Sequence, residues 1–356
     1  MHHFNYENGR LHCEGVDLND IADSVGTPVY VYSTATLVRH ARVIAAAFEG
    51  MDCLIAYSVK ANGNIAVLKT LAREGCGADV VSGGELKRAL MAGIPADRIV
   101  FSGVGKTRDE MALGLNVGIH QFNVESGAEL HALSEVAAGL GKVAPVALRV
   151  NPDVAAGGHP NISTGKAGDK FGVPWADAPG LYEQIKALPG VEAVGVDVHI
   201  GSQIGDLNPM RAAFEKTIGL VKDLRAAGHD LKRIDLGGGL GIPYERSNKA
   251  PPLPIEYGQV IRDTVGHLGC EIEIEPGRLI AGNAGILVTR VTYVKKAGER
   301  TFAILDGAMN NGADLPFSCK GGVCATCKAK VIEGKVEMDI NHSLSEQEVA
   351  EGMVLT

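Results

Sequence analysis

A regular alternation of short apolar stretches and helical segments runs through the middle of this 356-residue chain. Segments with apolar residues at helical spacing separate eight stretches with strand character, which begin at residues 54, 77, 98, 120, 146, 195, 233 and 271. Eight such repeats over about 220 residues predict a closed (β/α)8 barrel. The alternative is an open doubly wound sheet, which the lack of a G-x-G-x-x-G motif after the first strand disfavours.

The sequence on either side of these repeats alternates apolar and polar residues without helical segments. Residues 29–33 read VYVYS, and a similar strand-like pattern resumes after residue 278. We therefore expect residues 35–277 to form the barrel. Residues 1–34 and 278–310 are expected to supply the strands of an incomplete β domain.

Composition narrows the choice of partners and compartment. A formal net charge of −8 argues against a nucleic-acid partner, which would require a basic patch. Residues 1–15 show no basic stretch followed by an apolar one, and no apolar run is long enough to span a bilayer. These features predict a soluble cytoplasmic protein without a membrane or nucleic-acid partner. In that compartment Cys13, Cys53, Cys76 and Cys270 read as reduced thiols.

In a barrel of this kind, functional groups lie at the carboxyl-terminal ends of the strands. The predicted strand ends are unusually polar, and they carry Lys60, Asp79, Ser82, Ser102, Asn123, Glu125, Arg149, Asn151, His199, Ser202, Gly237, Gly238, Gly239, Glu275, Gly277 and Arg278. Turn formation explains the glycine, asparagine and serine members of this set. It explains the lysine, the histidine, Glu275 and Arg278 poorly.

Lys60 follows the apolar run at residues 54–59 and precedes Asn62 and Gly63. Desolvation of a buried ammonium lowers its pKa, and a lysine with a lowered pKa is a nucleophile that can form a Schiff base. On this stretch alone, a lysine that extends from a strand end to water is an equally good interpretation.

A glycine-rich turn at residues 236–241 follows the seventh predicted strand. Its backbone N–H groups could approach an anion, and this fold often binds phosphate near its last two strands. Ser202 could add a hydroxyl group and Arg278 a charged donor. The alternative is a tight turn that needs positive φ angles at several positions.

A phosphate site, a nucleophilic lysine and an acidic residue in one barrel mouth predict pyridoxal phosphate as the cofactor. Lys60 would hold it as a Schiff base, and Glu275 would keep its pyridine nitrogen protonated. His199 would lie against the ring, although it could equally be a core histidine. A metal site is disfavoured, because His199, Asp197 and Glu275 have no recognised ligand spacing.

Six motifs together resemble diaminopimelate decarboxylase, a member of the alanine-racemase-like class of pyridoxal-phosphate barrels. They lie at residues 56–62, 77–86, 151–172, 198–203, 234–244 and 275–285, and the resemblance runs from about residue 1 to Asn310. It implies decarboxylation of meso-2,6-diaminopimelate to L-lysine, the last step of lysine biosynthesis. It also implies a homodimer with active sites at the interface.

The resemblance assigns catalytic roles to Lys60 and His199. Arg278 is expected to meet both cofactor and substrate, and residues 159–166 resemble a loop that borders the substrate, with His159 and Ser163 as contacts. Glu275 speaks against a racemase, since that sister family places an arginine at the pyridine nitrogen. The strand-end residues Asp79, Arg149 and Ser202 are added to this set. The full predicted cofactor site is then Lys60, Asp79, Arg149, His199, Ser202, Gly238, Gly239, Glu275, Pro276, Gly277 and Arg278.

The resemblance stops after Asn310. The family continues with an arginine and a tyrosine that bind substrate, a cysteine–glutamate pair whose cysteine donates a proton from the partner subunit, and a late tyrosine. None of these motifs is present in this sequence. We therefore expect impaired catalysis and weakened dimerisation. A barrel that binds the cofactor without catalysis is a further alternative.

Residues 311–356 carry Cys319, Cys324 and Cys327 in the C-x4-C-x2-C spacing of plant-type 2Fe–2S ferredoxins. The segment resembles the C-terminal ferredoxin part of phenylacetyl-CoA-type oxygenase reductases, shortened at its end. No cysteine follows Cys327, so the fourth ligand is absent from this sequence. Electron transfer through a 2Fe–2S cluster is thus an alternative function. A zinc site and three unligated thiols are the other interpretations of these cysteines.

Overall fold

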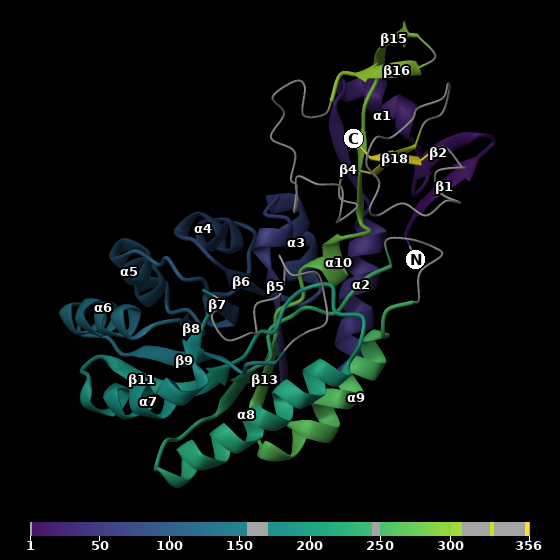
Figure 1. The fold of residues 1–356 in the computed structure, drawn as a ribbon. Coiled ribbons are helices and arrows are strands. Elements are labelled where there is room, and N and C mark those ends of the chain that lie inside the picture. Colours follow the sequence, from purple (N-terminus) through teal and green to yellow (C-terminus); the bar gives the residue numbers. More distant parts are fainter. Residues whose placement is uncertain are drawn as a thin grey trace. The chain divides into compact units, whose positions relative to one another are not determined.

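The computed structural model describes residues 2–154, 170–243, 250–298, 300–307, 328–330 and 353–355 (Figure 1). The chain divides into two compact units. One comprises residues 34–242 and 251–283, and the other comprises residues 1–33, 243–250 and 284–356. Within the described residues, every helix is too short or too polar to cross a membrane.

The larger unit is a closed barrel of parallel strands, as predicted. In barrel order the strands are β5 (Cys53–Ser58), β6 (Gly77–Val80), β7 (Ile99–Phe101), β8 (Gln121–Val124), β9 (Ala144–Asn151), β11 (Val191–Asp197), β12 (Arg233–Asp235) and β13 (Glu271–Ile274). Pairing of β13 with β5 and of β8 with β9 closes the ring. The short strand β10 (Val173–Pro174) adds to β9 in parallel.

Helices follow seven of the eight strands, and the eighth position is filled from the other end of the unit. The seven are α3 (Ile65–Arg73), α4 (Gly83–Met91), α5 (Arg108–Val117), α6 (Gly127–Gly139), α7 (Ala178–Ala187), α8 (Asn208–Ala226) and α9 (Pro254–Thr264). After β13 comes only the four-residue α10 (Arg278–Ala281). Helix α2 (Thr34–Ala47) precedes the first barrel strand and packs against α3 and α9. The predicted (β/α)8 barrel is therefore confirmed, with a last helix of only four residues and α2 packed beside α3 and α9.

Side-chain caps place the helix starts directly after the strands. The hydroxyl groups of Ser82, Thr107 and Ser126 accept hydrogen bonds from the backbone N–H three residues further on. Such caps satisfy N–H groups that a helix leaves unpaired at its start. Each cap lies on a short turn between a strand and a helix, which keeps the mouth of the barrel ordered.

Polar side chains fill much of the barrel interior. Asn123 on β8 donates to Asp235 on β12, and these strands are not neighbours in the ring. Their contact therefore crosses the interior. An apolar cluster of Leu54, Ala56 and Val100 occupies another part of it.

The smaller unit combines both ends of the chain, as predicted. It contains an antiparallel meander of β1 (Phe4–Glu7), β2 (Arg10–Cys13) and β3 (Val16–Asp17), followed by α1 (Leu18–Val25). Strand β4 (Val29–Tyr32), which covers the VYVYS stretch, pairs with β14 (Gly285–Val288). A small core of Phe4, Cys13, Leu18 and Val31 holds these elements together.

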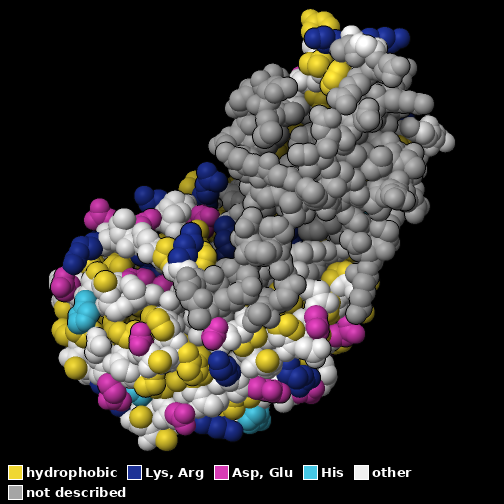
Figure 2. Space-filling view, in the orientation of Figure 1, with side chains coloured by type: hydrophobic (Ala, Val, Ile, Leu, Met, Phe, Trp, Pro, Cys, Tyr) yellow, Lys and Arg dark blue, Asp and Glu magenta, His cyan; other side chains and the backbone are white. Residues whose placement is uncertain are grey.

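The remaining described strands are β15 (Val291–Ala297) with β16 (Arg300–Leu305) and β17 (Lys328–Lys330) with β18 (Met353–Leu355), both antiparallel pairs. Tyr293 and Val294 on the first hairpin are exposed. On the face of the barrel unit that Figure 2 shows, acidic and basic side chains are interspersed.

Candidate active site

Lys60 lies in the short helix η1 (Val59–Ala61), directly after β5, with its side chain 52% exposed. Its Nζ donates to Asp79 Oδ2 at 2.9 Å. Desolvation acts to lower the pKa of Lys60, but the carboxylates of Asp79 and Glu275 outweigh it and raise that pKa. The expected buried lysine with a lowered pKa is therefore wrong. The structure instead shows a half-exposed ammonium with a buried counterion.

Asp79 is fully buried at the end of β6 and also accepts a hydrogen bond from Ser58 Oγ at 2.8 Å. Burial alone would raise the pKa of Asp79, but the charge and hydrogen bond of Lys60 and the hydroxyl of Ser58 lower it. Asp79 is thus an anion that holds the lysine ammonium in place.

Glu275 lies just after β13 and is 6% exposed. Its Oε1 accepts from Ser102 Oγ at 3.0 Å and from Asn123 Nδ2 at 3.4 Å, and Asn123 Nδ2 also donates to Asp235 Oδ2 at 2.9 Å. Burial, followed by the like charges of Asp235 and Asp79, raises the pKa of Glu275 well above its usual range. The carboxyl group is therefore able to hold a proton and share it with a basic nitrogen.

His199 is held as a neutral imidazole. Its Nδ1 accepts a hydrogen bond from the Gly238 N–H at 3.1 Å. Burial, then the charges of Arg149 and Lys60, lower the pKa of His199 well below its usual range. A neutral, flat ring at the barrel mouth can lie against the face of an aromatic ligand.

The glycine turn permits close backbone approach. A Cβ on Gly237 would lie 2.3 Å from His199 Nδ1, one on Gly238 2.3 Å from the Glu275 carbonyl, and one on Gly239 2.3 Å from the Gly201 carbonyl. Gly237 and Gly239 also have positive φ angles of 62° and 110°. The tight turn at residues 236–241 therefore requires glycine for its own geometry.

The N–H groups of this turn already have partners within the protein. Gly237 donates to Asp235 Oδ1 at 2.9 Å, and Gly238 donates to His199. A phosphate contact from Gly238 would therefore compete with His199. Arg278 Nε donates to Ser202 Oγ at 3.2 Å, so the structure does bring together the two side chains predicted to meet a phosphate.

Pro276 and Gly277 join the ends of β13 and β5. The Pro276 carbonyl accepts from the Ser58 N–H at 3.3 Å. A Cβ on Gly277 would lie 3.0 Å from Ser58 Cβ. These contacts fix the position of Glu275 beside Lys60, so both residues shape the site through the backbone.

Similarity to known proteins identifies the family of this chain. The pyridoxal-binding domain of the pyridoxal-dependent decarboxylases matches residues 34–282. The chain is 50% identical to diaminopimelate decarboxylase of Pseudomonas fluorescens, over 87% of this chain and 74% of that protein. This chain belongs to the diaminopimelate decarboxylase family. It is also 46% identical to the Zymomonas mobilis enzyme, over 86% and 74% of the two chains.

Solved structures of the family agree with the fold. Diaminopimelate decarboxylase from Helicobacter pylori, complexed with L-lysine, has a TM-score of 0.79 at 39% identity, over 83% of this chain and 74% of that one. The M. jannaschii enzyme in complex with L-lysine has a TM-score of 0.81 at 35% identity, over 86% and 74%. The family's cofactor is pyridoxal phosphate.

A second family match covers the C-terminal part. The 2Fe-2S iron-sulfur cluster binding domain matches residues 288–356. The match begins before the predicted boundary at residue 311 and includes the β15–β16 hairpin. Cys319, Cys324 and Cys327 lie outside the described residues, as do His159 and Ser163.

The charges at the barrel mouth suit pyridoxal phosphate. Five buried carboxyl groups lie at the mouth, and they belong to Asp79, Glu125, Asp197, Asp235 and Glu275. Asp197 Oδ1 is buried without a hydrogen-bond partner among the described residues. A protonated ring nitrogen would be stabilised by these carboxyl groups, and Arg278 with Ser202 suits a phosphate. The residues present therefore fit the family's cofactor.

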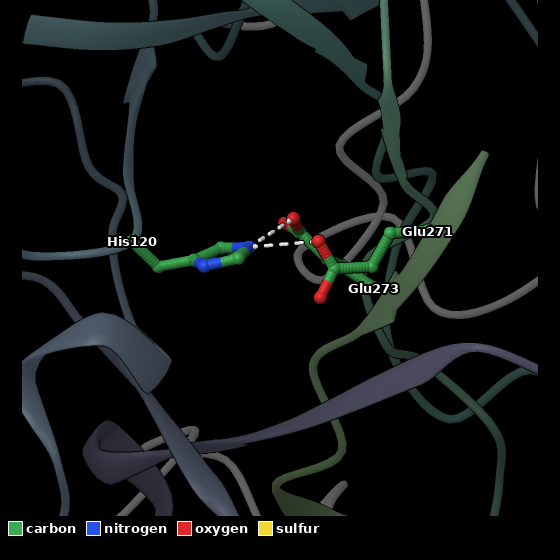
Figure 3. A group of neighbouring side chains, drawn as sticks. All are labelled: His120, Glu271 and Glu273. Carbon is green, nitrogen blue, oxygen red and sulfur yellow. Dashed lines mark hydrogen bonds and ion pairs between the residues drawn. The ribbon is translucent and has the colours of Figure 1, made fainter.

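Sequence reasoning missed a second polar group at the opposite end of the barrel (Figure 3). His120 Nε2 lies 2.9 Å from Glu273 Oε1 and 3.4 Å from Glu271 Oε2. Arg233 Nε lies 3.3 Å from the same Glu271 oxygen. Burial acts to lower the pKa of His120, but the two glutamates raise it to about 9. His120 and Arg233 thus balance the two carboxylates, and we assign no metal here.

Proposed function

We propose that this protein decarboxylates meso-2,6-diaminopimelate to L-lysine with pyridoxal phosphate. The observation that carries the proposal is the grouping of Lys60, Asp79 and Glu275 at one barrel mouth, in a chain that is 50% identical to a diaminopimelate decarboxylase over 87% of its length. The family's late motifs do not follow Asn310 in this sequence. We therefore expect a lower turnover than that of a chain with those motifs.

Bound pyridoxal phosphate supplies an electron-withdrawing ring that accepts the electron pair left when the carboxylate departs. The residues of the chain prepare this chemistry. Asp79 Oδ2 accepts a hydrogen bond from Lys60 Nζ and positions it. Because this pairing keeps the lysine protonated, the amine must release a proton to water before it can attack. Glu275, held by Ser102 and Asn123, would share a proton with the ring nitrogen.

Orientation of the cofactor falls to the residues around the rim. The neutral His199 ring would lie against the face of the cofactor. Arg278, together with Ser202, would bind the phosphate, and Arg278 would also meet the substrate. We assign further substrate contacts to His159 and Ser163 from the resemblance of residues 159–166 alone.

The direct test measures cofactor absorbance and carbon dioxide release together. Pyridoxal phosphate should give a Schiff-base band that Lys60→Ala removes, whereas Lys69→Ala, at an exposed position on α3, should retain it. Carbon dioxide should be released from meso-2,6-diaminopimelate. A missing band contradicts the cofactor assignment. A band without carbon dioxide release would instead support a non-catalytic cofactor-binding barrel.

The match to the 2Fe-2S domain favours a second candidate function. Cys319, Cys324 and Cys327 would supply three thiolates to a cluster in an electron-transfer segment like that of phenylacetyl-CoA-type oxygenase reductases. With three ligands we expect iron and acid-labile sulfide at less than one cluster per chain. Anaerobic purification with metal and sulfide analysis tests this, and Cys324→Ser should abolish any cluster.

We further infer a homodimer located in the cytoplasm. The dimer rests on the resemblance to the family, whose late motifs this sequence lacks. Sedimentation velocity over a range of protein concentrations should show a weak, reversible dimer. A strictly monomeric protein at all concentrations would contradict this inference.

A further inference from the structure

The carboxylate of Glu125 joins three separate segments at the mouth of the barrel. It lies directly after β8, and its side chain is 1% exposed. Oε1 accepts from the Gly103 N–H at 2.9 Å and lies 3.2 Å from Arg149 Nη1. Oε2 accepts from the Gly172 N–H at 3.0 Å. The turn after β7, strand β9 and the chain entering β10 are thus all bonded to one side chain.

Arg149 is the cation whose orientation this carboxylate fixes. It is 9% exposed, and its guanidinium carbon lies 5.0 Å from the centre of the Phe171 ring. Its charge contributes to keeping His199 neutral, and it also acts on Glu275. Movement of Arg149 would therefore alter the charges on both residues that we place against the cofactor ring.

Gly172 is pressed against the backbone of β9. Its φ is +71°, and a Cβ there would lie 3.0 Å from the Arg149 carbonyl and 3.3 Å from the Asn151 N. Strand β10 follows at once, with Val173 beside Val150. The Gly172 N–H bond to Glu125 therefore holds the chain at the point where it rejoins the barrel.

From these contacts we propose that Glu125 is a positioning residue that fixes Arg149 and the start of β10 at the barrel mouth. A glutamine could not replace it, since its NH2 group would face either a backbone N–H or a guanidinium, which are both donors. An aspartate is one methylene shorter. The effect on the cofactor rests on the proposed function, whereas the effect on β10 does not.

The test exploits the single tryptophan of the chain. Trp175 starts the short helix η4 (Trp175–Asp177), directly after β10, with Lys216 Nζ 5.3 Å from its ring centre. Its emission and its quenching by acrylamide report on the placement of this segment in protein without cofactor. Pyridoxal phosphate affinity, measured by absorbance, reports on the site.

Glu110→Gln is the matched control. Glu110 Oε1 accepts from the Gly83 N–H at 2.7 Å, and Oε2 accepts from the Thr107 N–H at 2.9 Å and from the Thr107 hydroxyl at 2.8 Å. It therefore also joins neighbouring turns, but its hydrogen bonds come from uncharged donors. We expect Glu125→Gln to increase quenching of Trp175 and to weaken cofactor binding roughly ten- to a hundredfold. Glu110→Gln should do neither. Unchanged quenching and affinity in Glu125→Gln, or equal effects of both variants, would overturn the proposal.

A double-mutant cycle keeps the proposal testable if Glu125→Gln folds poorly. Glu125→Asp retains the charge, and we expect a smaller change in the same direction. If Glu125 acts through Arg149, its effect on cofactor affinity should vanish in an Arg149→Gln background. Additive losses would overturn the proposal. If Glu125→Gln increases the quenching of Trp175 as expected but the unaltered protein releases no carbon dioxide, only the proposed reaction is contradicted.

Discussion

The two ends of the barrel hold their buried charges in opposite ways. At the floor, Glu271 and Glu273 face the cations His120 and Arg233, one for one. At the mouth, Glu275 follows the other end of the same strand, β13, and has hydroxyl and amide partners instead.

The contrast separates stability from function. A compensated set of buried charges can bind strands together, whereas the crowding of carboxyl groups at the mouth raises the pKa of Glu275 and is maintained at a cost in stability. In barrels of this kind, the carboxyl-terminal end of the strands carries the active site. The crowded carboxyl groups therefore lie at the active-site end of the barrel, where the protonated ring nitrogen of the cofactor would bind.

The largest expected effect comes from removing the acid at the mouth. Glu275→Gln should lower the rate of carbon dioxide release at least a hundredfold, or about 3 kcal/mol, because an amide cannot share an acidic proton with the ring nitrogen. Urea unfolding should show equal or greater stability, since one of several repelling carboxyl groups is lost. A marked loss of stability would contradict the distinction between the two ends.

Removing the acid at the floor should have the reverse outcome. Glu273→Gln should lower the free energy of unfolding by about 3 kcal/mol, because the buried His120 cation loses a carboxylate partner. Cofactor absorbance and affinity should stay as in the unaltered protein. Loss of the cofactor band in folded Glu273→Gln protein would show that the floor is not independent of the site.

The floor should also make stability depend on pH. The folded pKa of His120 is about 9, above its ordinary value of 6.5. Its contribution is therefore complete below about pH 6.5 and is lost as pH rises through about 9. We expect a loss of about 3 kcal/mol over this range, measured by urea unfolding. His120→Gln should remove most of this dependence, and an unchanged pH profile in that variant would contradict the assignment.

The smallest expected effects come from replacing a glycine by alanine, once at the mouth and once near the floor. Gly237→Ala at the mouth should cost about 1 kcal/mol of stability and should weaken cofactor binding, because its Cβ would displace His199. Gly195→Ala near the floor, where a Cβ would lie 2.7 Å from the Arg233 carbonyl, should destabilise without a specific effect on the cofactor. Equal losses of cofactor affinity in both variants would argue against a distinct role for Gly237.

Local sequence determined which residues reach the mouth, because strand ends follow from short-range patterns. Lys60, Glu275 and His199 could be placed in this way. The sequence could not reveal that Asp79 keeps Lys60 charged, since that pairing depends on the register of β5 against β6. Contacts across the interior, such as Asn123 with Asp235 or His120 with Glu273, require closure of the ring. Strand spacing alone does not specify them.

The origin of the eighth helix has a consequence for synthesis on the ribosome. Helix α2 is made first, but its partner α9 and the closing strand β13 emerge about 200 residues later. At the usual speed of translation this interval lasts on the order of 10 to 40 s. During that time α2 can pack against α3 but not against α9, so its apolar residues Leu37, Ala41 and Ile44 are less well covered than in the finished barrel. The nascent chain thus presents a chaperone target near its own beginning.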